Sequence, residues 1–199
     1  HFGNDLAEAL AQCGFDGFHL DQYGYPKVAL RTDGTRIDLT ESFVRLIESV
    51  RERVPGARLV FNNVNDFPTW ASAQASQDAV YIEVWEPHST HAALAQVIDR
   101  ARSVAGGRPV VIAAYQQVYA VAPREEADRA AALTMATVFS HGATHLLAGE
   151  ADRILVDPYY VRNHVAQPGT MDLLARYYDF LTEHHDLLIP PAIVEVTGS

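Results

Sequence analysis

The sequence is short of cysteine, of basic residues and of long apolar runs, and each shortage excludes a class of protein. Only one of the 199 residues is a cysteine, Cys13, so neither an intrachain disulfide nor a cysteine metal cluster can form. Lysine and arginine number 15 against 25 acidic residues. The formal net charge of −10 argues against a nucleic-acid partner, because phosphate binding needs a basic patch. Apolar runs such as 110–114 are far shorter than the roughly 20 residues that cross a bilayer, so we expect no membrane insertion.

Several motifs with well-defined chemistry are also missing. The sequence has no glycine-rich phosphate loop and no G-x-S-x-G elbow, which removes support for nucleotide binding and for serine esterase chemistry. His19 and Asp21 form an H-x-D pair, but no second strand-like run offers paired histidines. Zinc catalysis usually takes three converging protein ligands. We therefore expect no metal site.

Hydrophobic periodicity alternates between two kinds of segment. An apolar fraction of 48% and a charged fraction of 20% are typical of one globular domain. Short runs rich in β-branched and aromatic residues predict strands at 16–22, 58–64, 79–85, 109–115 and 144–149. Apolar residues at helical spacing predict helices at 4–12, from a cap at Asp38 or Thr40 to about Val54, and at 90–105, 125–140 and 170–184.

Five strands that alternate with helices predict an α/β fold with right-handed βα units and a parallel sheet. Since a barrel of this class needs eight strands, the chain is either a compact open sheet or part of a (β/α)8 TIM barrel. We favour five βα units forming the C-terminal part of the barrel, with the first three units absent, because acidic residues fall at strand ends. Residues 1–199 would then be a partial catalytic domain, with 189–199 as an extended tail leading towards a following domain.

Two acidic residues, Asp21 and Glu83, stand among aromatic residues at the ends of predicted strands. The C-terminal ends of parallel strands form the mouth of an α/β barrel, where such folds keep their chemistry. Neighbouring strands are about 4.8 Å apart, so carboxyl groups two strands apart can approach each other. A separation of about 5–5.5 Å is typical of glycosidases that retain anomeric configuration. The pair predicts a retaining glycosidase, with Asp21 as nucleophile and Glu83 as proton donor and then base.

Aromatic and amide side chains near the same strand ends are candidate sugar ligands. Aromatic rings offer flat faces for pyranose rings, and amides both donate and accept hydrogen bonds, which suits hydroxyl groups. Turn formation is an equal explanation for the asparagines after the second strand, and Glu150 could instead cap the next helix. The candidate substrate-binding residues are His19, Tyr23, Asn62, Asn63, Tyr81, Trp85, Tyr115, Gln116 and Glu150.

Three segments resemble glycoside hydrolase family 66, which comprises the endo-dextranases and the cycloisomaltooligosaccharide glucanotransferases. The run Gly-Phe-Asp-Gly-Phe-His-Leu-Asp-Gln-Tyr-Gly at 14–24 resembles the family's nucleophile region, with the nucleophile at Asp21. The run Ile-Glu-Val-Trp at 82–85 resembles its acid/base region, with the acid/base at Glu83. Residues 176–181 resemble its tyrosine-rich closing helix.

This resemblance implies a (β/α)8 barrel that acts with retention on α-1,6-linked glucan, without a cofactor or a catalytic metal. It implies an α-glucan polysaccharide or oligosaccharide as partner and an extracellular or cell-surface location. Glucanotransferases of the family carry a carbohydrate-binding insert inside the barrel, and none interrupts 83–188, which favours an endo-dextranase. The alternatives are a cycloisomaltooligosaccharide glucanotransferase, another retaining α-glycosidase, and a non-catalytic carbohydrate-binding protein on a degenerate barrel.

Overall fold

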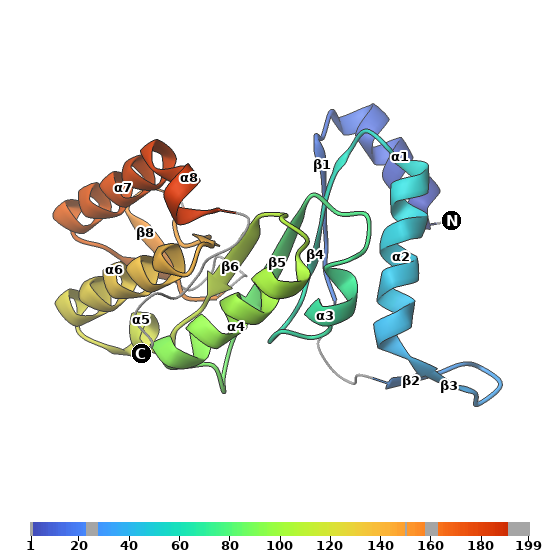
Figure 1. The fold of residues 1–199 in the computed structure, drawn as a ribbon, viewed down its shortest axis with the longest axis horizontal. Coiled ribbons are helices and arrows are strands. Elements are labelled where there is room, and N and C mark those ends of the chain that lie inside the picture. The colour runs from blue at the N-terminus through green and yellow to red at the C-terminus, as the bar shows by residue number, and fades with distance from the viewer. Residues whose placement is uncertain (1, 23–27, 150, 158–162, 191–199) are drawn as a thin grey trace.

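A five-stranded parallel sheet forms the centre of the protein. The structure is a computed structural model, and it describes residues 2–22, 28–149, 151–157 and 163–190. The strands lie side by side in sequence order, all parallel (Figure 1): β1 (Gly17–Leu20), β4 (Arg58–Asn62), β5 (Ala79–Val84), β6 (Val110–Ala114) and β7 (Thr144–His145). Each strand lies inside a range predicted from periodicity, so the parallel α/β order is confirmed.

Helices separate the strands, and the longer ones lie where periodicity predicted them. The longer ones are α1 (Phe2–Cys13), α2 (Leu39–Arg53), α4 (His91–Val104), α6 (Arg124–Ser140) and α7 (Pro168–Glu183). Asp38 caps α2 by accepting a hydrogen bond from the Thr40 amide at 2.8 Å, as the sequence suggested. Figure 1 shows α1 and α2 beside β1 at one end of the sheet, and α6 and α7 at the other. None of the described helices combines the length and apolar character that a membrane crossing needs.

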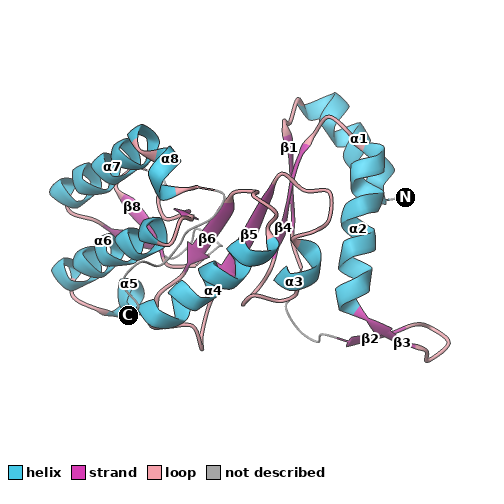
Figure 2. Ribbon diagram, in the orientation of Figure 1, coloured by secondary structure: helices cyan, strands magenta, loops and turns pink. Residues whose placement is uncertain are grey.

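Short elements escaped the sequence analysis. Two antiparallel strand pairs join β2 (Val28–Leu30) to β3 (Arg36–Asp38), as Figure 2 shows, and β8 (Arg153–Leu155) to β9 (Asn163–Val165). The short helices are α3 (Thr69–Ser72), α5 (Gln117–Val121) and α8 (His185–Leu188). Runs of three to five residues are too brief for either hydrophobic period to register, so periodicity could not reveal them.

Helices cover one face of the sheet. On that face, Ile82 of β5 packs in one core with Ile98 of α4, and Phe61 of β4 packs in another with Ile47 of α2. The opposite face carries a smaller cluster: Tyr81, Ala113, Tyr115 and Leu155. The register of the strands places Asn62 beside Tyr81, and Glu83 beside Ala113, on this second face. No helix of the described residues belongs to this second cluster, and its face is the one that would line a barrel.

Closure of a barrel stays a prediction. Within the described part of the chain, β1 and β7 are the two end strands of the sheet, and each pairs with one neighbour in it. The same helices and strands would therefore fit the compact open sheet as well as the C-terminal part of a barrel.

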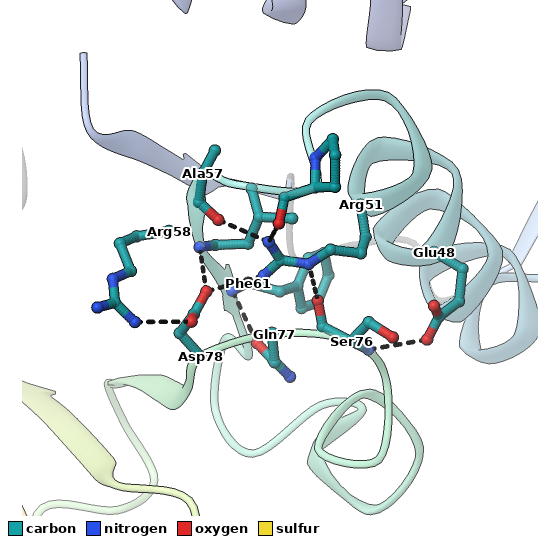
Figure 3. A network of polar contacts seen from close by, with 10 residues as sticks. Glu48, Arg51, Ala57, Arg58, Phe61, Ser76, Gln77 and Asp78 are labelled. Atoms are coloured by element: carbon teal, nitrogen blue, oxygen red, sulfur yellow. Dashed lines mark hydrogen bonds and ion pairs between the residues drawn. The ribbon is translucent and has the colours of Figure 1, made fainter.

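A polar network secures the N-terminal half of β4 (Figure 3). The Asp78 carboxylate accepts hydrogen bonds from the Leu59 amide and the Arg51 guanidinium, both at 2.8 Å. Gln77 Oε1 accepts a hydrogen bond from the Phe61 amide at 3.0 Å. The hydrogen bond from the Leu59 backbone amide, followed by the Arg51 and Arg58 side chains, holds the pKa of Asp78 below its usual range. Side chains just before β5 thus accept two backbone hydrogen bonds of β4 that strand pairing leaves unmade.

A buried histidine ends the sheet. His145 of β7 is 1% exposed, and its backbone carbonyl accepts a hydrogen bond from the Tyr178 hydroxyl of α7. Neither ring nitrogen has a hydrogen-bonding partner of good geometry among the described residues. Burial lowers the pKa of His145 to about 4, although the nearby Ala114 carbonyl opposes the shift.

Acid should therefore destabilise the protein through His145. Below pH 6.5 the unfolded chain binds a proton at this residue that the folded chain excludes until about pH 4. The free energy of unfolding should fall across this window by about 3 kcal/mol, a term that His145→Leu removes. Unfolding by urea at pH 7 and pH 4.5 measures the difference. The exposed His185 provides the control, because His185→Leu should keep the wild-type acid sensitivity.

Candidate active site

The carboxylates of Asp21 and Glu83 meet at the side chain of Asn62. Asn62 ends β4, which lies between β1 and β5, so its amide stands between the two acidic residues. Its Nδ2 donates hydrogen bonds to Asp21 Oδ1 and to Glu83 Oε2, each at 2.8 Å. The structure thus brings together the two carboxylates that the strand ends predicted.

The shared donor limits how far apart the carboxylates lie. Both accepting oxygens are 2.8 Å from one nitrogen, so their separation cannot exceed twice 2.8 Å. Retaining glycosidases place their carboxyl groups about 5–5.5 Å apart, whereas inverting enzymes need about 6.5–9.5 Å to admit a water molecule. The geometry therefore matches double displacement better than single displacement.

Each carboxylate has one further donor. The backbone amide of Gln22 donates to Asp21 Oδ1 at 2.8 Å, and the indole Nε1 of Trp85 donates to Glu83 Oε1. Asp21 is exposed, whereas Glu83 is half-buried. The two residues thus occupy different surroundings, as distinct roles in one reaction require.

His19 and Tyr81 stand next to the carboxylates. Their rings are in edge contact, with centroids 4.4 Å apart. His19 is exposed, yet partial desolvation of its ring lowers its pKa, and the charges of Asp21 and Glu83 only partly oppose this. Burial, followed by the neighbouring Tyr115 and the two carboxylates, raises the pKa of Tyr81 well above its usual range. Near neutral pH the site therefore holds a neutral imidazole and a protonated phenol, which are suited to hydrogen bonding with hydroxyl groups.

An aromatic pocket opens beside the carboxylates. The rings of Trp85 and Tyr115 have centroids 5.2 Å apart and are tilted by 46°. With Gln116, they line a pocket of about 270 Å³. Its other lining residues are Glu86, Ser89, Gln117, Ala120 and Val156. A pocket with two aromatic walls and amide groups has the composition of a sugar-binding site.

The structure does not bring Asn63 to this face. Its side chain is fully buried, where it donates to the carbonyls of Tyr81 at 2.8 Å and Phe61 at 3.2 Å, and accepts from the Ser72 hydroxyl at 2.5 Å. These bonds tie β4 and β5 to α3, so the expectation that Asn63 contacts sugar is replaced by a structural role. Two other candidates, Tyr23 and Glu150, lie outside the described residues.

Gln22 and Asn65 also belong to the site. Gln22 donates from Nε2 to the carbonyls of Asn62 at 2.7 Å and Phe67 at 2.8 Å. Asn65 accepts from the Trp85 amide at 2.7 Å and donates to the Glu86 carbonyl at 2.8 Å. Both hold backbone beside a carboxylate. The sequence indicated Gln22 as a possible hydrogen-bond partner of Asp21 and Asn65 as part of an amide run, but the backbone contacts of their side chains could not be predicted from it.

No group of three or more His, Cys, Asp or Glu side chains is placed to hold a metal ion in the described ranges. The Asp21 and Glu83 carboxylates instead accept their bonds from amide and indole donors. The arrangement is thus two carboxylates held close together by neutral hydrogen-bond donors.

Comparisons of the sequence with known proteins all indicate one family of glycoside hydrolases. A family model described as Glycosyl hydrolase family 66 matches residues 1–193. Two curated cycloisomaltooligosaccharide glucanotransferases from Niallia circulans are each 30% identical to this chain, over 135 and 149 residues. The alignments cover 62% and 69% of this chain, but the chain spans only 14% and 15% of those relatives.

A solved structure has the same fold. It is the crystal structure of a Paenibacillus sp. cycloisomaltooligosaccharide glucanotransferase complexed with cycloisomaltoheptaose. The match has a TM-score of 0.86 at 16% sequence identity and covers 98% of this chain and 47% of that one. Because the family match extends over residues 1–193, this chain belongs to glycosyl hydrolase family 66.

Proposed function

We propose that the chain supplies the catalytic carboxylates of a retaining glycoside hydrolase that cleaves the α-1,6-glucosidic linkages of dextran, an endo-dextranase. The observation that carries this proposal is the hydrogen bonding of both carboxylates to one amide nitrogen, each at 2.8 Å. That spacing suits double displacement. Membership of family 66 supports action on an α-glucan, since both relatives are named cycloisomaltooligosaccharide glucanotransferase.

The reaction has two displacements in this proposal. Asp21 attacks the anomeric carbon while the bond to the leaving oxygen breaks, and Glu83 gives its proton to that oxygen. Water then attacks the glycosyl-enzyme ester as Glu83 takes the water proton, and Asp21 is released as a carboxylate. The sugar leaves with the configuration it had in the polymer, because each displacement inverts it once.

The remaining polar and aromatic residues bind the glucan. In this proposal, Trp85 and Tyr115 stack on a glucose ring, and Gln116 hydrogen bonds to its hydroxyl groups in the adjoining pocket. His19 and Tyr81 contact the sugar next to the scissile bond, since they touch each other beside the carboxylates. Tyr23 and Glu150 stay candidates by their sequence positions alone.

The wider setting is also a proposal. We infer that the bare face of the sheet continues as the interior of a (β/α)8 barrel, for which residues 1–199 supply the later units. The position of the carboxylates at the C-terminal ends of β1 and β5 supports this, because barrel enzymes keep their active sites there. An extracellular or cell-surface location follows from the polymeric substrate, which does not enter cells readily.

A cycloisomaltooligosaccharide glucanotransferase is the second candidate, because both curated relatives have that name. Both enzymes form the same glycosyl-enzyme and differ in whether water or a sugar hydroxyl resolves it. The chain from α4 through α7 runs without an inserted domain, which favours hydrolysis.

The product profile of the full-length enzyme on dextran tests the proposal. Chromatography and mass spectrometry should show short linear isomaltooligosaccharides, each heavier by one water than the corresponding ring. Cyclic products would instead identify the enzyme as a glucanotransferase. Release of glucose alone would indicate an exo-acting glycosidase, and binding without any product would indicate the non-catalytic protein.

A further inference from the structure

We propose that Asn62 is a positioning residue that places the nucleophile and the acid/base together, and that it does not itself bind sugar. This inference rests on the proposed function and concerns the same site. Asn62 was a candidate sugar ligand because of its amide, but the structure shows where both amide hydrogens go. One is donated to Asp21 Oδ1 and the other to Glu83 Oε2.

The burial of Asn62 supports a role within the protein. The residue is 1% exposed, which leaves little surface for a ligand. Its Oδ1 is buried and has no hydrogen-bonding partner among the described residues. Turning the amide over would place this oxygen against two carboxylates and leave their bonds unmade, so only one orientation is favourable. An amide whose oxygen is unpartnered while both hydrogens are donated points to its NH2 group as the functional part.

The backbone of Asn62 is held from the opposite direction. Gln22 Nε2 donates to the Asn62 carbonyl at 2.7 Å, and the Gln22 amide donates to Asp21 Oδ1 at 2.8 Å. The segment that follows β1 is therefore hydrogen-bonded to the backbone of β4, and the Asn62 side chain of β4 donates to Asp21 in return. These reciprocal bonds fix the Asp21 carboxylate relative to β4 without any sugar present.

The hydrogen bonds also distinguish the two oxygens of the nucleophile. Asp21 Oδ1 accepts from both the Gln22 amide and Asn62, whereas Oδ2 receives no hydrogen bond within the described ranges. A carboxylate oxygen that accepts two bonds is a weaker nucleophile than its free partner. The geometry thus leaves Oδ2 to attack the anomeric carbon, and Asn62 turns it towards the sugar.

The same amide orients Glu83. Asn62 holds Oε2 and the Trp85 indole holds Oε1, so the carboxyl group cannot rotate freely. The donor between the residues also reduces the repulsion of two charges that lie close together. Removing the Asn62 amide should displace both carboxylates at once. Removing a residue that only binds sugar should displace neither.

Asn62→Leu in the full-length enzyme tests this inference with two substrates. On dextran, kcat should fall by about 10²-fold or more while KM stays within about threefold of wild type, because placement is lost and not binding. With α-isomaltosyl fluoride, the first turnover needs the nucleophile but no proton donor, since fluoride leaves unaided. Asn62→Leu should slow the first release of fluoride by a similar factor, whereas Glu83→Gln should retain most of it.

Two further variants keep the result interpretable. Gln77→Met removes another buried amide bonded to β4 without touching either carboxylate, so it should lower the unfolding temperature but retain kcat and fluoride release. If Asn62→Leu does not fold, Asn62→Ser offers one donor for two carboxylates and should still lower kcat at nearly constant KM. Thermal unfolding separates the loss of fold from the loss of placement.

Three other outcomes would overturn the inference, and one of them would also overturn the proposed function. A higher KM with unchanged kcat in Asn62→Leu would make Asn62 a sugar ligand and overturn the inference. Wild-type fluoride release in that variant would show that Asn62 does not place Asp21, which also overturns it. If the wild-type enzyme neither cleaved dextran nor released fluoride, the proposed function would be overturned, and this inference with it.

Discussion

Replacing Asp21 by Asn in the full-length enzyme is expected to lower the rate of dextran cleavage by at least about 10³-fold. The amide has nearly the same shape and can still accept the hydrogen bond from the Gln22 amide. It cannot form a glycosyl ester, because its nitrogen and carbonyl oxygen are poor nucleophiles. Release of reducing ends from dextran measures the loss, and the thermal unfolding midpoint shows whether the fold is intact.

The Asp21 prediction has a matched control and a clear opposite result. Asp172 is an exposed residue of α7, and Asp172→Asn should retain wild-type activity. If Asp21→Asn retained more than about a tenth of the rate, a covalent role for Asp21 would be untenable. Mass spectrometry of the enzyme trapped with a slow fluorinated glycosyl fluoride should place the label on the peptide that contains Asp21.

The second large effect concerns Glu83. Glu83→Ala should lower dextran cleavage by about 10³-fold, because neither the leaving oxygen nor the attacking water has a proton partner. With α-isomaltosyl fluoride, added azide should restore turnover by about tenfold or more, since azide enters the space of the lost carboxylate and needs no base. The product should be the α-glycosyl azide, because azide then resolves a covalent intermediate formed on Asp21.

The configuration of the azide product decides between the two role assignments. A β-glycosyl azide from Glu83→Ala would mean that azide replaced the nucleophile, which would exchange the roles of Asp21 and Glu83. Nuclear magnetic resonance of the anomeric proton distinguishes the two products. Glu52→Ala removes an exposed carboxylate of α2 and should show neither the loss nor any response to azide.

Much of the fold could be predicted because its strands are buried on at least one face and its helices are long. The run at 79–85 and the apolar residues of 90–105 became β5 and α4 with only small changes at their ends. The antiparallel strand pairs could not be predicted, because strands of three residues carry too few side chains for a pattern. Closure into a barrel depends on what the end strands meet, and no pattern within one strand encodes that.

The site was predictable to a similar extent. Strand-end acidic residues directed attention to Asp21 and Glu83, and the structure joins them through Asn62. The adjacent amides Asn62 and Asn63 looked equivalent in sequence, yet only one reaches the carboxylates. Successive residues of an extended chain point to opposite sides, so the tertiary partners of each side decide which amide meets the site.

The amino-acid sequence by itself determined the order of strands and helices and the two acidic positions, because these follow from local periodicity and from residue type. Only the tertiary structure decided that one amide donates to both carboxylates, that Asn63 is hydrogen-bonded to α3, and that Gln22 donates to the backbone of β4. These outcomes depend on the directions of hydrogen bonds between residues that lie 9 to 41 positions apart in the chain. Such directions exist only once parallel strands lie side by side, so they leave no periodic trace in the chain.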